Sequence, residues 1–97
     1  MQLIKVRLKG SSLGATRNIR CPLPEVRVLD ILEGTDGMTG TQISRASGGT
    51  ISRARANRLI EKLKERDLVK SFARFVDGDD LPVRRVFHVP TFERIEQ

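Results

Sequence analysis

Apolar and polar residues alternate at the start of the chain. Ile4, Val6 and Leu8 are separated by lysine and arginine residues, so each apolar position lies two residues from the next. This period of two predicts a half-buried β-strand over Leu3–Lys9, because successive strand side chains point to opposite faces of a sheet. The apolar side of this strand needs a cover, which either a sheet of the same chain or a second subunit would provide.

A helix is predicted from Pro24 to Glu33, with Gly34 directly after it. Proline is tolerated in the first turn of a helix because its missing N–H would have no partner there. Apolar residues occur on nearly all sides of this helix. We therefore expect it to be the most buried helix and to serve as scaffold.

Two further helices are predicted around a glycine turn. Thr39 and Gln42 are three residues apart, which is the spacing of a capping box at a helix N-terminus. Gly48 and Gly49 are expected to end that helix, because glycine adopts the left-handed backbone conformation at little steric cost. Either Thr50 or Ser52 can cap the helix that follows.

The helix after the glycine turn has an apolar stripe and a cationic face. The stripe follows the 3.6-residue period and consists of Ala56, Leu59, Ile60 and Leu63. The opposite face carries Ala54, Asn57, Arg58, Glu61 and Glu65, with Arg53 and Arg55 on its flanks. All charges before Leu59 on this helix are arginines, which suits insertion into a DNA major groove, since arginine and asparagine pair with guanine and adenine edges. The alternative is an ordinary solvated face of an amphipathic helix.

A hairpin is predicted near the end of the chain. Lys70–Val76 and Val83–Val89 are rich in β-branched and aromatic residues, and a turn cluster of aspartate, glycine and proline separates them. Met38–Thr39 is predicted to form a very short strand, and Phe92–Gln97 a final short helix. Six residues have too little intrinsic helix propensity to hold such a helix without packing.

Composition and charge narrow the class of protein. The 97 residues, 38% hydrophobic and 31% charged, suit one globular domain. No apolar run approaches the roughly 18 residues of a transmembrane helix, and we expect no signal peptide. The single Cys21 cannot form an internal disulfide, which fits a reducing cytosol. The net charge of +6 predicts a polyanionic partner, and the cations gather in two zones, residues 1–20 and 51–75.

Along Val26–Val89 the expected order is helix, short strand, helix, turn, helix and hairpin. The stretch RANRLIEKLKERDLV resembles the end of the recognition helix of bacterial MarR- and PadR-type regulators and its step into the wing. The resemblance implies an α+β winged helix-turn-helix fold, with three helices, a two- to three-stranded antiparallel wing and, here, an extra N-terminal β-strand. The chain would divide into a basic strand and arm, residues 1–21, and the winged helix-turn-helix domain, residues 22–97. Asp67 stands where the family usually has glycine, and aspartate tolerates left-handed geometry better than most residues.

Charge and resemblance together predict a sequence-preferring binder of double-stranded DNA. We expect a small transcriptional regulator, a repressor, acting as a homodimer in the cytoplasm and associated with the nucleoid. The predicted base contacts are Arg53, Arg55, Asn57 and Arg58. The predicted phosphate contacts are Arg45, Thr50, Ser52, Arg74, Arg84, Arg85, Arg17 and Arg20. Arg17 and Arg20 are assigned to a flexible arm, and the acidic hairpin tip is expected to point away from DNA because phosphates would repel its aspartates.

Two alternatives stay open: an architectural DNA binder of the plasmid-partition or phage type on repeated sites, and a winged-helix module that binds protein or RNA. Enzyme chemistry is only weakly indicated. His88 lies in a predicted strand and Cys21 has no histidine near it in sequence, so packed side chains are the expected roles. The tip aspartates, Asp77, Asp79 and Asp80, lack the spacing and terminal glutamate of an EF-hand loop. We expect no enzymatic activity, no catalytic residue, no metal site, no cofactor and no membrane partner.

Overall fold

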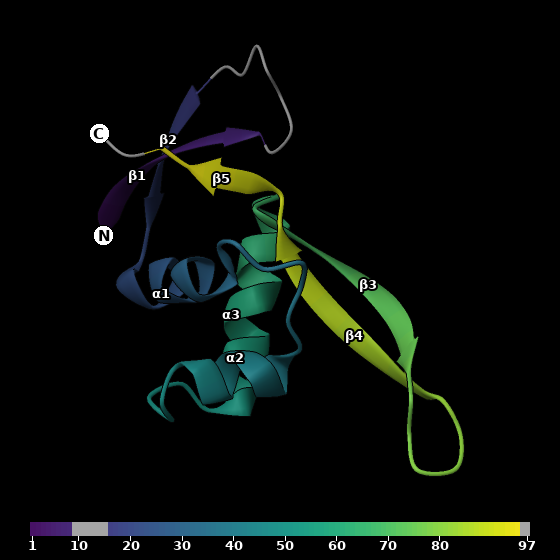
Figure 1. Cartoon of the computed structure of the whole chain (residues 1–97). Helices are drawn as coiled ribbons and strands as arrows, with labels where there is room; N and C mark the ends of the chain where they lie inside the picture. Colours follow the sequence, from purple (N-terminus) through teal and green to yellow (C-terminus); the bar gives the residue numbers. More distant parts are fainter. Residues whose placement is uncertain (9–15, 96–97) are drawn as a thin grey trace.

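The computed structural model describes residues 1–8 and 16–95, which form an α+β fold (Figure 1). Lys9, the last residue of the first predicted strand, and residues 96–97 of the predicted final helix lie outside the described residues. The helices are α1 (Leu23–Leu32), α2 (Gly40–Ala46) and α3 (Arg53–Glu65), and the strands are β1 (Gln2–Leu8), β2 (Thr16–Cys21), β3 (Val69–Val76), β4 (Val83–Pro90) and β5 (Phe92–Arg94). None of the described helices is long and apolar enough to cross a membrane.

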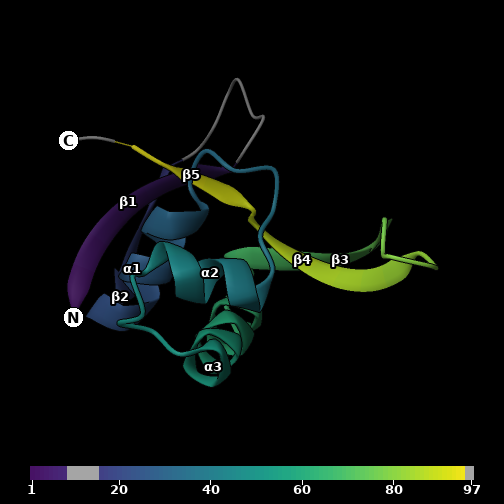
Figure 2. The same cartoon turned by 60° about the horizontal axis from the view of Figure 1, so that its bottom comes forward.

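The predicted N-terminal strand is the centre of a three-stranded antiparallel sheet in the order β2-β1-β5. Its alternating apolar residues Ile4 and Val6 are each 2% exposed, and they belong to the same buried cluster as the apolar residues of α1 and α3. The apolar side of β1 is therefore covered by the chain itself. Figure 2 shows this sheet lying across the helices rather than beside them.

Two predictions about the segments around β1 are wrong. Arg17 and Arg20, predicted to lie in a flexible arm, belong to β2, which pairs with β1 from Gln2 to Arg7. Phe92–Arg94, predicted as the start of a helix, form β5 on the other edge of β1. Pairing with an existing strand satisfies backbone N–H and C=O groups that a very short helix would leave without partners, so the tertiary context overrides local propensity.

Helix α1 agrees with its prediction and anchors the sheet. Val26, Val28 and Leu32 are at most 2% exposed, and the helix ends one residue before the predicted boundary. An ion pair joins Arg94 of β5 to Asp30 of α1. The sheet and the first helix are thus held by both apolar packing and a surface charge pair.

The predicted capping box and glycine turn are both present. Thr39 accepts from the backbone N–H of Gln42, whose side chain accepts in turn from the N–H of Thr39. Gly48 and Gly49 have φ of 68° and 86°, the left-handed region where glycine is favoured. Ser52, one of the two predicted candidates, caps α3 by accepting from the N–H of Arg55.

Side-chain hydrogen bonds fix the turn between α2 and α3. The hydroxyl of Ser44 donates to the carbonyl of Ile51 at 2.8 Å, and the N–H of Ile51 donates to the hydroxyl of Ser47 at 3.1 Å. Ser47 donates in turn to the carbonyl of Ser44. With Ile51 only 3% exposed, this network sets the angle at which α3 leaves the turn.

Helix α3 buries the predicted stripe and leads into the hairpin. Ala56, Leu59, Ile60 and Leu63 are at most 9% exposed. At its end Asp67 has φ of 59°, so aspartate does adopt the left-handed conformation that the sequence predicted for it. The carbonyl of Asp67 accepts from the hydroxyl of Thr91, which ties the turn to the segment between β4 and β5.

Strands β3 and β4 form the predicted hairpin, which projects away from the helices in both views (Figures 1 and 2). The predicted short strand at Met38–Thr39 is present as a single bridge between Met38 and His88. One face of the hairpin carries the stacked rings of Phe72 and Phe87, with centroids 5.7 Å apart. Strand alternation places Arg84 and His88 on the other face.

Candidate nucleic-acid interface

The arginines at the front of α3 diverge to two sides of the helix. Each residue turns the helix by about 100°, so Arg53 and Arg55 are roughly 200° apart around the axis. Asn57 follows Arg53 on one side, and Arg58 follows Arg55 on the other. All four residues predicted to contact bases are exposed. The exposed face therefore presents cations on both flanks, with the small Ala54 between them.

These arginines are not engaged in internal ion pairs. In residues 1–8 and 16–95 the ion pairs are Arg7–Glu93, Lys64–Glu61 and Arg94–Asp30. Each of them belongs to the sheet or to the C-terminal half of α3. The positive charge at the front of α3 is thus available to an anionic partner.

The first recess beside α3 lies between the helix pair and the hairpin, and we call it the hairpin-side recess. It has a volume of about 340 Å³. Its lining residues are Thr39, Gly40, Thr41, Arg53, Asn57, Arg84, Arg85, Val86 and His88. Two predicted base-contacting residues and two predicted phosphate-contacting residues, far apart in sequence, therefore meet on one surface.

Asn57 is less free within this recess than its sequence position suggests. Its amide oxygen occupies the space that a Cβ on Gly40 would need. The amide thus packs against the first turn of α2 while the residue stays exposed to solvent. A larger residue at position 40 would displace the Asn57 amide from this position.

A second recess lies on the other side of α3, and we call it the α1-side recess. It has a volume of about 160 Å³ and is lined by Leu23, Pro24, Arg27, Thr50, Ile51 and Arg55. Arg27 is exposed and is the one basic residue of α1. From the sequence α1 is predicted to be scaffold, and Arg27 is not among the predicted contacts. Because α1 also carries Glu25 and Asp30, its one basic residue was not a distinctive signal.

The two hydroxyls predicted to hold phosphate differ in what they can donate. Thr50 already donates its hydroxyl proton to the carbonyl of Ser47 at 2.8 Å. Ser52 only accepts, from the N–H of Arg55, so its own proton remains available. A hydroxyl has one proton to donate, so Ser52 is the better phosphate donor of the two.

The three arginines of the hairpin divide between its faces. Arg84 shares a face with His88, toward the hairpin-side recess, whereas Arg74 and Arg85 are cross-strand partners on the opposite face. The guanidinium of Arg74 lies over both rings of the aromatic pair, 5.7 Å from each centroid. Arg85 still borders the recess. Arg84 and Arg85 are thus closer to α3 than Arg74 is.

The remaining predicted phosphate contacts are distributed over the molecule. Arg45 is exposed in the last turn of α2. Arg17 lies in β2 with its guanidinium 5.9 Å from the ring centroid of Phe92. The carbonyl of Arg20 accepts a hydrogen bond from Arg66, the C-cap residue of α3. Because α3 has 13 residues and rises about 1.5 Å per residue, its C-terminal end lies roughly 20 Å from its cationic front.

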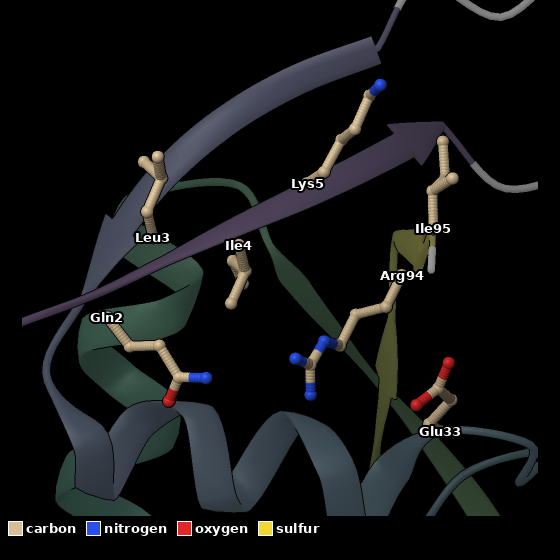
Figure 3. Close-up of a pocket in the computed structure, with 7 residues that line it drawn as sticks. All are labelled: Gln2, Leu3, Ile4, Lys5, Glu33, Arg94 and Ile95. Atoms are coloured by element: carbon tan, nitrogen blue, oxygen red, sulfur yellow. The ribbon is translucent and has the colours of Figure 1, made fainter. Parts of the chain in front are cut away.

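A larger groove, of about 760 Å³, separates β1 from the end of α1 (Figure 3). Gln2, Ile4 and Arg94 point into it from the sheet, and Glu33 borders it from the helical side (Figure 3). Arg94 is already paired with Asp30. The groove thus lacks the unpaired arginine pairs that distinguish the two recesses beside α3.

His88 and Cys21 are buried side chains, and each has a hydrogen-bond partner. His88 is 8% exposed, and its Nδ1 is 2.7 Å from the hydroxyl of Ser71. Burial lowers the pKa of His88, and Lys64 nearby lowers it further. Burial raises the pKa of the Cys21 thiol, although Arg66, which donates to its sulfur at 3.3 Å, opposes this shift. In the described part of the chain, no group of three or more His, Cys, Asp or Glu residues is arranged to hold a metal ion.

In comparisons with known proteins, no family model, curated protein or solved structure matches the chain. The resemblance to MarR- and PadR-type regulators therefore stays a prediction.

Proposed function

We propose that this protein binds double-stranded DNA with a sequence preference and acts as a small transcriptional regulator, a repressor. The observation that carries the proposal is the cationic front of α3. Arg53, Arg55 and Arg58 are exposed there, and none of them is part of an ion pair in residues 1–8 and 16–95. Arginine readily makes bidentate hydrogen bonds to guanine and to phosphate, and duplex DNA offers both.

The arrangement of elements supports a winged helix-turn-helix. In this interpretation α2, the glycine turn and α3 are the helix-turn-helix, and the β3–β4 hairpin is the wing. The major groove is about 12 Å wide and admits one helix. The buried stripe of α3 faces α1 and α2 while its arginines face outward, which is the orientation a recognition helix needs.

Base reading and backbone binding are assigned to different residues. Arg55, Asn57 and Arg58, with Arg53, read base edges, while the backbone is held by Arg45, Ser52, Arg84 and Arg85. Thr50 has no free proton and contributes less. Arg17 and Arg20, which belong to the sheet, would contact only DNA that extends beyond α3.

A homodimer on a palindromic site is part of the proposal. Because Ile4 and Val6 of β1 are buried in the core of their own chain, the apolar side of this strand is not available to a second subunit. On the outer side of the sheet Leu3 is 54% exposed, which leaves this surface as a candidate interface. Sedimentation of the protein at several concentrations, with Leu3→Ser as the comparison, tests this part.

Selection from a randomised duplex pool tests the proposal as a whole. The protein is mixed with the pool, shifted complexes are isolated, and their DNA is sequenced. We expect one enriched short palindrome that footprinting then shows as a single protected site. A long protected array would instead favour the architectural alternative, and better competition by RNA than by duplex DNA would refute the proposal.

A further inference from the structure

The two recesses beside α3 place cations on both sides of the proposed recognition helix. On one side Arg53 lies with Arg84 of the hairpin, and on the other Arg55 lies with Arg27 of α1. The hairpin side was anticipated from the sequence, but the α1 side was not. Arg27 and Arg55 have 27 residues of chain between them, lie on different helices and meet only in the folded molecule.

The chemistry of the α1-side recess suits an oxyanion. Two arginines, Arg27 and Arg55, line it, and in the described chain neither belongs to an ion pair. Its volume of about 160 Å³ is several times the roughly 30 Å³ that one water molecule occupies in the liquid, so a phosphate group fits. The guanidinium fork binds phosphate oxygens through two parallel hydrogen bonds. The rest of the lining consists of the apolar Leu23, Pro24 and Ile51 and of Thr50, whose hydroxyl donates to the carbonyl of Ser47. None of these side chains carries a negative charge that would compete with an oxyanion.

We infer that Arg27 and Arg55 form a binding site for a backbone phosphate on the DNA strand opposite to the one that the hairpin contacts. Arg55 then moves from base reading to backbone binding, and Arg53, Asn57 and Arg58 remain to read base edges. This inference rests on the proposed function. A helix lying in the major groove has one sugar-phosphate backbone along each side. The hairpin-side recess takes phosphates of one strand through Arg84 and Arg85, and the α1-side recess takes a phosphate of the other strand. Helix α1 thereby becomes part of the interface, and the two contacts fix the rotation of α3 in the groove.

Strand-specific backbone neutralisation tests this arrangement. The duplex selected above is prepared with single methylphosphonate linkages, which remove one phosphate charge at a time from one strand or the other. For the wild-type protein we expect weaker binding at a few linkages on each strand. Within each half-site of the palindrome, Arg27→Ala should abolish the penalty only for linkages on one strand, and Arg84→Ala only for linkages on the other. If both variants abolish penalties on the same strand of a half-site, or if Arg27→Ala abolishes none, the inference is wrong.

Salt dependence provides a second readout with a matched control. Loss of one phosphate contact should flatten the slope of log K against log salt concentration by about 0.9. We expect this change and roughly 10- to 150-fold weaker binding for Arg27→Ala, since hydrogen bonds to charged groups contribute on the order of 1.5–3 kcal/mol. Lys70→Ala removes the same charge from β3 outside both recesses and should leave the slope unchanged. Equal changes in the two variants would mean that only net charge matters, and would overturn the inference.

A free anion is the other source of the same chemistry. Inorganic phosphate is titrated into the protein while the side-chain Nε–H signals of Arg27 and Arg55 are followed by NMR. Wild-type protein that binds phosphate saturably, with Arg27→Ala removing this binding but leaving DNA binding unchanged, would show that the recess binds a free anion. This result would overturn the role of the recess in DNA binding. Failure of the wild-type protein to bind any duplex would instead remove the proposed function itself, and this inference with it.

Discussion

The three-stranded sheet and the hairpin are both antiparallel and both rich in cations, but their cations have different surroundings. In the sheet, two of the five cations have carboxylate partners, Arg7 with Glu93 at 2.6 Å and Arg94 with Asp30 of α1, whereas Lys5, Arg17 and Arg20 have none within the described residues. In the hairpin, Arg84 and Arg85 have no carboxylate partner within the described residues. Both structures repeat the same strand geometry, so the difference lies in what each surface is free to bind.

The apolar residues of the sheet and of the hairpin differ in how much of their surface is exposed. Ile4 and Val6 of the sheet are buried, whereas Phe75 and Val86 of the hairpin are 69% and 40% exposed. The sheet is covered by α1 on one face, but the outer half of the hairpin projects from the body and has no layer over it (Figure 1). The sheet therefore contributes to the stability of the fold, whereas the hairpin leaves apolar and cationic side chains exposed to solvent.

The largest expected effect is on stability and comes from the sheet. Ile4→Ala removes buried atoms from the core and should lower the free energy of unfolding by about 2–5 kcal/mol. Val86→Ala in the hairpin should change it by less than about 0.5 kcal/mol, because this side chain is exposed. Urea unfolding followed by circular dichroism measures both. Similar losses in the two variants would show that the hairpin is packed as firmly as the sheet.

The next effect is on DNA binding and comes from α3 and the hairpin. Arg58→Ala should reduce discrimination between the selected duplex and random DNA by about 1–3 kcal/mol, the value of one good bidentate base contact. Arg84→Ala should instead weaken binding to all duplexes alike, since a phosphate contact carries no sequence information. Competition titrations with both DNAs separate the two behaviours. Equal losses on both DNAs in each variant would remove this division of roles.

A smaller effect is expected for the paired cations of the sheet. Arg94→Ala breaks the ion pair between Arg94 and Asp30. Because these two side chains are 33% and 49% exposed, the substitution should lower the free energy of unfolding by at most about 1 kcal/mol. The affinity of this variant for DNA should equal that of the wild-type protein. A drop in affinity as large as that of Arg84→Ala would contradict the view that paired cations serve the fold.

The smallest expected effect is a pH dependence of the free energy of unfolding that comes from His88, at the base of the hairpin. Burial lowers the folded-state pKa of His88 below the value of about 6.5 expected for the unfolded chain. The unfolded state then binds more protons, so stability should fall as the pH decreases through about 6.5 toward the folded-state pKa. The urea concentration at the midpoint of unfolding, measured between pH 5 and 8, should fall less toward acidic pH in His88→Gln than in the wild-type protein. An identical decline in both proteins would assign it to other groups.

Elements with strong local signals were predicted correctly from the sequence. The capping box at Thr39 and Gln42, the glycine turn and the apolar stripe of α3 depend on residues close together in the chain. Such patterns specify the conformation of a segment without reference to the rest of the molecule. The left-handed Asp67 belongs to the same group.

The errors fall where distant segments meet. Strands β2 and β5 have little strand signal of their own, and they form because β1 offers an edge on each side. Arg27 lies on a helix whose sequence indicates only burial, and its position near Arg55 depends on how α1 packs against α3. Neither outcome is encoded by a short pattern of residues.

The sequence by itself determined the helices, the hairpin, the buried stripe of α3 and the concentration of arginine at the front of that helix. The tertiary structure alone decided which cations are paired and which surfaces they share. The physical reason is that helix caps and hydrophobic periods act over a few residues, whereas ion pairs and recesses require segments that only packing brings together. For this protein, that packing placed one set of arginines beside carboxylates and left the other facing solvent on both sides of α3.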